Sequence, residues 1–103
     1  MVYIKVHDTE NGSIIAMCDE QLIDKVLGEG DIVIDVKSYN SFYKGEKMNK
    51  NDAGKLISEL DHVYSANIIG SESVDVAISS KLIDKKGVMW IGKVPYAHSY
   101  SMD

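Results

Sequence analysis

The sequence has no arginine, one cysteine and no long hydrophobic segment. Arginine carries the planar guanidinium that best recognises phosphates and guanine, so its absence counts against a typical basic nucleic-acid-binding domain. The lone Cys18 cannot form an internal disulfide, which is typical of a reducing compartment. No segment approaches the roughly 18 apolar residues of a membrane span, and the N-terminus lacks the basic region of a signal peptide. We therefore expect a soluble, cytoplasmic protein that does not associate with a membrane.

The length and apolar content limit the number of domains that the chain can form. The chain has 103 residues, of which 45% are hydrophobic, and this is the size of one domain. A domain of this length buries roughly 60–70% of the surface of its unfolded chain, which suffices without a disulfide or a structural metal. We therefore expect residues 1–103 to form a single domain.

Positive charge is concentrated in two segments of a chain whose formal net charge is −5. Residues 37–50 carry four lysines and one acid, and residues 81–103 carry four lysines and two acids, whereas the rest is acidic. Six of the eight aromatic side chains lie in the same two segments: Tyr39, Phe42, Tyr43, Trp90, Tyr96 and Tyr100. Lysines neutralise phosphates and rings stack on bases, so this combination predicts a surface that binds a polyanion.

The first third of the chain predicts a β-hairpin followed by a helix. Residues 2–7 alternate apolar and polar side chains, Asn11-Gly12 is a strong hairpin-turn pair, and residues 13–18 are mostly apolar. Asp19 then has the chemistry of an N-cap, apolar residues follow at helical spacing, and Gly28 marks an end. The sequence therefore predicts a short helix after the hairpin.

The remainder predicts strands and helices that alternate along the chain. Further strands are expected over residues 31–36, 66–70, 88–91 and 96–100. Further helices are expected from Asn49 or Asn51 to Val63, and from Ser71 or Ser73 to Leu82. Residues 37–50 have neither periodicity and predict a long irregular loop. About six strands and three helices in this order predict an α+β, two-layer domain.

Six short segments, spread over nearly the whole chain, carry a resemblance to a known family. They are Tyr3–His7, Ala16–Leu22, Gly30–Val36, Phe42–Glu46, Ala66–Gly70 and Gly92–His98. Their order and spacing resemble a small archaeal family classed as domain of unknown function 424. The resemblance implies a predicted RNA-binding protein without known catalysis. It also implies a histidine directly after Pro95, where this chain has Tyr96 and places His98 two residues later.

The resulting hypothesis is a non-catalytic RNA-binding protein, associated with translation or the ribosome. Lysines would follow the phosphate backbone, and each stacked base would contribute roughly 1–3 kcal/mol. The predicted contact residues are Lys37, Tyr39, Phe42, Tyr43, Lys44, Lys47, Lys50, Lys93, Tyr96 and His98. The alternative at these positions is structural, with Phe42 and Tyr43 anchoring the loop and Tyr96 and His98 packing in the core.

Two other functions remain open from the sequence. In one, the acidic surfaces dock a basic partner such as a ribosomal protein. In the other, Cys18 or His98 serves a small enzyme. A predicted helix N-terminus beside Cys18 would lower the thiol pKa, whereas the neighbouring Asp19 and Glu20 would raise it.

No cofactor or metal is predicted. The three histidines have no metal-ligand spacing with one another or with Cys18. The pair Gly28 and Gly30 follows a predicted helix rather than a strand, which is the wrong context for a dinucleotide-binding loop.

Overall fold

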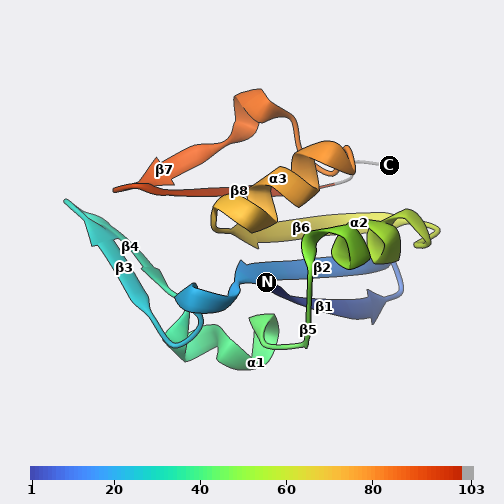
Figure 1. Ribbon diagram of the computed structural model, residues 1–103, viewed down its shortest axis with the longest axis horizontal. Helices are drawn as coiled ribbons and strands as arrows, with labels where there is room; N and C mark the ends of the chain where they lie inside the picture. The colour runs from blue at the N-terminus through green and yellow to red at the C-terminus, as the bar shows by residue number, and fades with distance from the viewer. Residues whose placement is uncertain (101–103) are drawn as a thin grey trace.

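In the computed structural model, residues 1–100 are described, and they form a six-stranded sheet, a two-stranded sheet and three α-helices (Figure 1). The strands are β1 (Val2–Thr9), β2 (Gly12–Asp19), β3 (Val26–Glu29), β4 (Ile32–Asp35), β5 (Glu46–Met48), β6 (Val63–Ile69), β7 (Met89–Ile91) and β8 (Val94–Tyr100). The α-helices are α1 (Asn40–Tyr43), α2 (Lys50–Ser58) and α3 (Ser71–Ser79), with 3-10 turns at Glu20–Leu22, Lys37–Tyr39 and Lys85–Gly87. The predicted α+β class is confirmed.

The larger sheet has the strand order β5-β1-β2-β6-β8-β7. Strands β1 and β2 pair along their whole length, from Val2 opposite Asp19 to Thr9 opposite Gly12, which confirms the predicted N-terminal hairpin. Strand β6 runs parallel to β2, and every other neighbouring pair in this sheet is antiparallel. A parallel pair requires a crossover connection, and here the chain between β2 and β6 contains the small hairpin, α1, β5 and α2.

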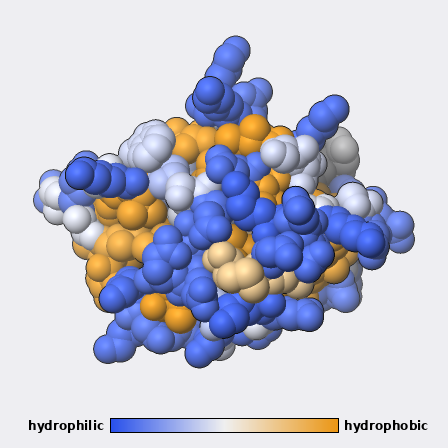
Figure 2. All heavy atoms as spheres, in the orientation of Figure 1, coloured by the Kyte–Doolittle hydropathy of each residue, from blue (hydrophilic) through white to orange (hydrophobic). Residues whose placement is uncertain are grey.

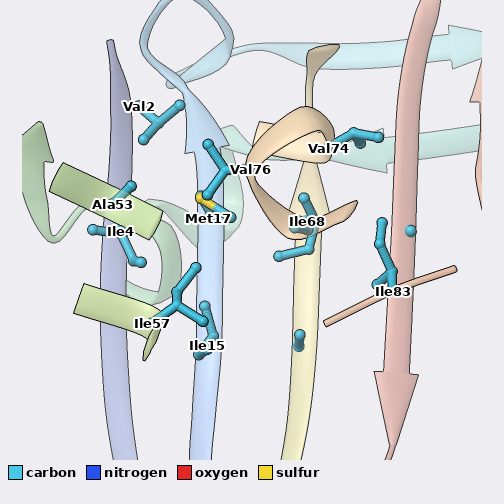
Figure 3. Packing of buried hydrophobic residues seen from close by; sticks show 13 residues of the cluster. Val2, Ile4, Ile15, Met17, Ala53, Ile57, Ile68, Val74, Val76 and Ile83 are labelled. Carbon is cyan, nitrogen blue, oxygen red and sulfur yellow. The ribbon is translucent and has the colours of Figure 1, made fainter. Parts of the chain in front are cut away.

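The main hydrophobic core lies between one face of the larger sheet and the helices α2 and α3 (Figure 3). Every second residue of each central strand points toward this layer, as Ile15 and Met17 do in β2. Helix α2 contributes Ala53 and Ile57, which are one helical turn apart and therefore on one side of the helix. Full burial of a side chain such as Ile15 contributes roughly 1.5–3 kcal/mol.

A second, smaller core lies on the opposite face of the same sheet. Its fully buried members are Cys18, Val36 and Ile69. The partly buried side chains around them come from β3, β4, α1, β8 and the turn after β2: Leu22, Ile23, Leu27, Ile34, Tyr43, Val94 and Tyr96. This face is therefore covered at one end by the β3–β4 hairpin and the segment that leads into α1.

The predicted helix over residues 19–28 is wrong. Only Glu20–Leu22 makes a helical turn, Asp24 has a left-handed backbone with φ of 69°, and β3 follows as an extended strand. Leu22, Ile23 and Leu27 reach the second core from this backbone without a helix, whereas Val26 is exposed. Glu29 pairs with Ile32 around a two-residue turn. The pair Gly30-Asp31 between two apolar runs is a sequence signal for this hairpin. The helical spacing of the neighbouring apolar residues obscured that signal.

The predicted irregular loop over residues 37–50 is also wrong, because the segment folds into a 3-10 turn, α1 and β5. Strand β5 pairs with the start of β1, with Met48 opposite Val2. Gly45 allows this approach, since a methyl group on it would overlap the carbonyl group of Ile4.

Strands β3 and β5 account for the difference between the expected six strands and the observed eight. Val63 begins β6 instead of ending α2.

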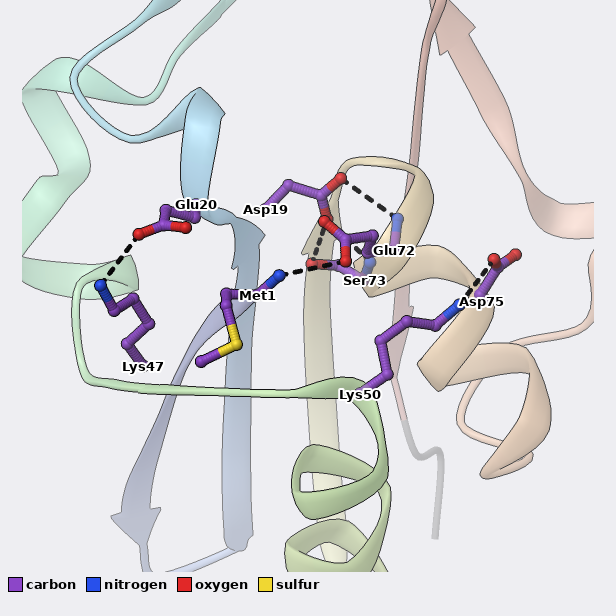
Figure 4. Close-up of polar contacts among 8 residues, drawn as sticks. All are labelled: Met1, Asp19, Glu20, Lys47, Lys50, Glu72, Ser73 and Asp75. Atoms are coloured by element: carbon purple, nitrogen blue, oxygen red, sulfur yellow. Dashed lines mark hydrogen bonds and ion pairs between the residues drawn. The ribbon is translucent and has the colours of Figure 1, made fainter.

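Asp19, at the end of β2, caps α3 instead of a helix of its own (Figure 4). Its carboxylate is 1% exposed and accepts hydrogen bonds from the Glu72 backbone N–H at 3.1 Å, the Ser73 backbone N–H at 2.8 Å and the Ser73 hydroxyl at 2.8 Å. Gly70 precedes the helix with φ of 109°, and a methyl group there would overlap the carboxylate. The N-terminus of α3 is therefore capped by an aspartate from a distant strand, and not by Ser71 or Ser73 as predicted.

Replacing Asp19 by asparagine tests the importance of this cap. We expect Asp19→Asn to lower the free energy of unfolding by about 1–3 kcal/mol, because the amide nitrogen would face the backbone N–H of either Glu72 or Ser73, which would then have no acceptor. Urea denaturation measures the change. The control is Asp75→Asn, which breaks only the exposed Lys50 ion pair and should stay within about 0.5 kcal/mol of the parent. Equal stability of the two variants would contradict the assignment.

Candidate functional site

The face of the larger sheet opposite α2 and α3 carries most of the side chains that could bind a ligand or take part in a reaction. The strand register aligns them in three rows, because directly paired residues point to the same side of a sheet. The first row is Tyr3, Cys18, Ile69 and Tyr96, the second is Lys5, Ala16, Asn67 and His98, and the third is His7, Ile14, Ser65 and Tyr100.

Helix α1 is fixed over the β1 end of these rows. The His7 ring stacks on the Phe42 ring with their centroids 4.8 Å apart, and His7 Nε2 lies 3.0 Å from the Phe42 carbonyl oxygen. Lys5 Nζ donates a hydrogen bond of 2.6 Å to the Ser41 carbonyl. Tyr43 meets Phe42 edge to face and enters the second core. Phe42 and Tyr43 therefore hold α1 to the sheet, which is the structural alternative considered from the sequence.

A cavity of about 170 Å³ remains between β4, α1 and the strands β6 and β8, and we call it the Asn67 pocket. Its lining residues are Ile34, Tyr43, Asn67, Ile68, Ile69, Tyr96, Ala97 and His98. Asn67 and His98 face each other across the β6–β8 pair, and the His98 ring lies 6.1 Å from the exposed Tyr100 ring. Among the side-chain hydrogen bonds of residues 1–100, none involves Asn67 or His98.

The predicted contact residues divide into those that meet at this pocket and those that do not. Tyr43, Tyr96 and His98 come together there. Tyr39 is 62% exposed on the turn before α1. Among the described residues, the remaining predicted lysines that are exposed and make no ion pair are Lys37, Lys44 and Lys93.

Two of the predicted lysines are held by acids instead. Lys47 Nζ lies 2.9 Å from Glu20 Oε2, and Lys50 Nζ lies 3.2 Å from Asp75 Oδ2 on α3 (Figure 4). The Glu20 carboxylate raises the pKa of Lys47, first through its hydrogen bond and then through its charge. Lys50 belongs to α2 and so to the helix layer, away from the pocket.

Asn67 is the main pocket residue that sequence reasoning missed. It is the only polar side chain in the apolar run from Ala66 to Ile69. A polar residue inside a buried strand usually has a specific partner, so this break in the run is the signal that would have found it.

Cys18 does not have the environment of a nucleophile. Its side chain is fully buried, and burial, followed by the charge of Asp19, raises its pKa to about 12. Its Sγ donates to the Asp19 carbonyl oxygen at 3.4 Å. Burial and then Cys18 raise the pKa of Tyr43 to about 12 as well. Both groups are therefore protonated near neutral pH, and the thiolate that nucleophilic attack requires does not form.

Two further features bear on function. Within residues 1–100, no three side chains of His, Cys, Asp or Glu lie close enough together to hold a metal ion. None of the helices in that part of the chain has the length and hydrophobicity needed to span a membrane.

Alkaline pH should destabilise the protein through Cys18 and Tyr43. Their pKa values are about 12 in the folded chain, against ordinary values of 9.0 and 10.0, so the unfolded chain releases these protons first. This contribution to stability is complete below about pH 9 and is lost as the pH rises toward 12. Urea denaturation at a series of alkaline pH values measures the loss.

The matched variants separate this effect from general alkaline denaturation. Cys18→Ala combined with Tyr43→Phe should flatten the decline, because neither residue can then ionise. Tyr100→Phe removes an exposed phenol and should leave the decline unchanged. A double variant that loses stability as steeply as the parent would contradict the role of these two groups.

Comparison with known proteins identifies the family. The model of the family described as "Protein of unknown function (DUF424)" matches residues 6–102. A crystal structure of an uncharacterized conserved protein from Methanopyrus kandleri is 24% identical and aligns with a TM-score of 0.80 over 96% of this chain and 90% of that chain, which shows a shared fold. No curated protein matches the chain significantly. The family match, which covers nearly all of the sequence, shows that the chain belongs to the DUF424 family.

Proposed function

We propose that the protein binds single-stranded RNA without catalysis, in association with the translation apparatus. The observation that carries the proposal is the exposed pair of rings on β8, next to the Asn67 pocket. His98 is exposed, Tyr100 is 64% exposed, and the two rings lie at the uncovered end of the sheet face. Aromatic rings on an open sheet face are the surface on which many proteins stack unpaired bases.

The charges favour a binding mode in which stacking outweighs phosphate contacts. Of the lysines predicted to contact RNA, Lys47 and Lys50 already pair with acids. Lys37, Lys44 and Lys93 are exposed on turns at the border of the sheet face that the β3–β4 hairpin and α1 partly cover. If all three contact phosphates, the logarithm of affinity should fall with the logarithm of salt concentration at a slope of about −2.

The test is fluorescence anisotropy with labelled single-stranded RNA at increasing salt. We expect saturable binding at low salt with that shallow slope. His98→Ala with Tyr100→Ala should weaken binding at least about fivefold, because a stacked base contributes roughly 1–3 kcal/mol. Lys44→Ala should weaken binding and reduce the salt slope.

Lys50→Ala is the matched control for the lysine variant. It removes the same charge from the helix layer and should leave RNA affinity unchanged. Circular dichroism should show that each variant keeps the parent fold. The proposal is overturned if the parent protein shows no saturable RNA binding at low salt.

A second candidate, docking to a basic protein partner such as a ribosomal protein, rests on a different surface. Exposed apolar side chains gather on the β3–β4 hairpin and on β7: Val26, Ile32, Val33, Met89 and Trp90. Figure 2 shows hydrophobic surface over the hairpin at the left of the view. Glu29 and Asp31 lie at the hairpin end beside these apolar groups. Exposed apolar side chains next to acids fit a protein interface better than an RNA interface.

Chemical crosslinking of the whole protein in lysate, with mass-spectrometric mapping, tests this candidate. Crosslinks to a basic protein should map to the hairpin and β7, and Val33→Glu should abolish them because it places a charge at an exposed apolar position of the hairpin. Lys81→Glu, which places an acid just beyond α3, is the control. Crosslinks that survive Val33→Glu would contradict a hairpin interface.

A further inference from the structure

We infer that the rings of His98 and Tyr100 each receive one of two neighbouring RNA bases that are not stacked on each other, so that the site prefers runs of pyrimidine nucleotides to runs of adenosine. The inference rests on the proposed RNA binding and adds to it the class of strand that is bound. Three observations carry it: the spacing of the two rings, the angle between their planes and the open space beside them.

The two rings are separated by more than the spacing of stacked bases. His98 and Tyr100 are two residues apart on β8, so they point to the same side of the sheet. Their ring centroids lie 6.1 Å apart. Stacked nucleotides in one strand of a regular helix follow each other at about 3.4 Å. Two neighbouring bases that stay stacked therefore cannot each lie on a ring of their own.

The angle between the ring planes has the same consequence. The planes are inclined at 69°, an edge-to-face arrangement that aromatic pairs favour. A base stacks parallel to the ring beneath it, so bases on the two rings would be inclined to each other by a similar angle. A single base clamped between both rings would instead need the rings to be parallel. The observed arrangement therefore suits two separate bases that share no face.

Both rings stand at an open edge of the sheet. The pairing of β7 with β8 ends at Tyr96, so in the described part of the chain no strand lies beside His98 or Tyr100 on that side. On the other side these two residues are opposite Asn67 and Ser65 of β6, respectively, whose side chains are small. The exposed fraction of Tyr100 is 64%, and His98 is exposed as well. An RNA strand can therefore reach both rings from the sheet face and from its edge.

A site that separates neighbouring bases discriminates between strands by the free energy of unstacking them. Neighbouring adenines overlap through two fused rings each, so they cost more to separate than neighbouring pyrimidines. The imidazole of His98 and the phenol of Tyr100 are single rings, so the second ring of a purine regains little overlap on them. Differences in stacking strength and backbone flexibility produce preferences for pyrimidine runs without a hydrogen bond to a base edge. The site should therefore favour uridine and cytidine runs over adenosine runs.

Fluorescence anisotropy with labelled oligo(U), oligo(C) and oligo(A) of equal length tests the preference. We expect both pyrimidine strands to bind at least about threefold more tightly than oligo(A) at low temperature. The difference should shrink on warming within the range in which the protein stays folded, because heat removes the stacking of oligo(A) before it binds.

The dependence on strand length tests the use of two rings. Uridine monophosphate and the uridine dinucleotide compete with labelled oligo(U) for the site. We expect the dinucleotide to bind at least about fivefold more tightly, because only the dinucleotide reaches both rings. Each competitor carries one phosphate group, so an added phosphate contact does not explain this gain.

His98→Ala and Tyr100→Ala should each reduce the affinity for the dinucleotide to that of the monophosphate and narrow the preference for oligo(U) over oligo(A). Tyr100→Phe keeps a ring and should retain both properties. The matched control is Trp90→Ala, which removes an exposed ring from the same edge of the sheet. Because Trp90 pairs with Pro95, it lies on the opposite side of the sheet, and its loss should change neither property.

The outcomes separate this inference from the proposed function. Equal or tighter binding of oligo(A), or a pyrimidine preference that survives the loss of both rings, overturns the inference and leaves RNA binding intact. A dinucleotide that binds no more tightly than the monophosphate does the same. Absence of saturable binding to all three strands overturns the proposed function and this inference together.

Discussion

The carboxylate of Asp19 is the group on which the arrangement of this protein most depends. It joins the end of β2 to the start of α3, and its three hydrogen bonds replace the water that burial removes. These hydrogen bonds also hold the turn between β6 and α3 against the end of β2, which runs parallel to β6. Because Asp19 occupies the N-terminus of α3, that helix end is not open to a phosphate, and any contact with RNA must come from elsewhere.

The two faces of the larger sheet have different roles. Helices α2 and α3 close one face and make the main core. The other face is covered by α1 and the small hairpin only in part, and the uncovered part brings Asn67, His98 and Tyr100 to the surface. Lysines are few there, and a chain of net charge −5 has little long-range attraction for RNA. In the proposed complex with RNA, shape and stacking would therefore supply most of the specificity.

Local patterns predicted the existence of the N-terminal hairpin, α2, α3 and the last strands, because each has a clear period, but they did not predict the end of α2 or the cap of α3. They misassigned residues 19–28, where apolar residues at helical spacing also fit an extended strand that packs on a second core. The aromatic residues of the segment 37–50 show the same limit. Tyr39 is exposed, Phe42 stacks on His7, and Tyr43 packs against the second core, yet no sequence pattern separates the three.

The sequence by itself determined the size, the acidic character, the α+β class and the family of this protein, since these depend on composition and on short-range order. Only the tertiary structure decided which helix Asp19 caps, because its partner Ser73 lies 54 residues away. It also decided that Tyr43, Asn67 and His98 meet in one pocket. Contacts of this kind follow from strand order and register, which depend on how the two faces of the sheet are buried rather than on any local pattern.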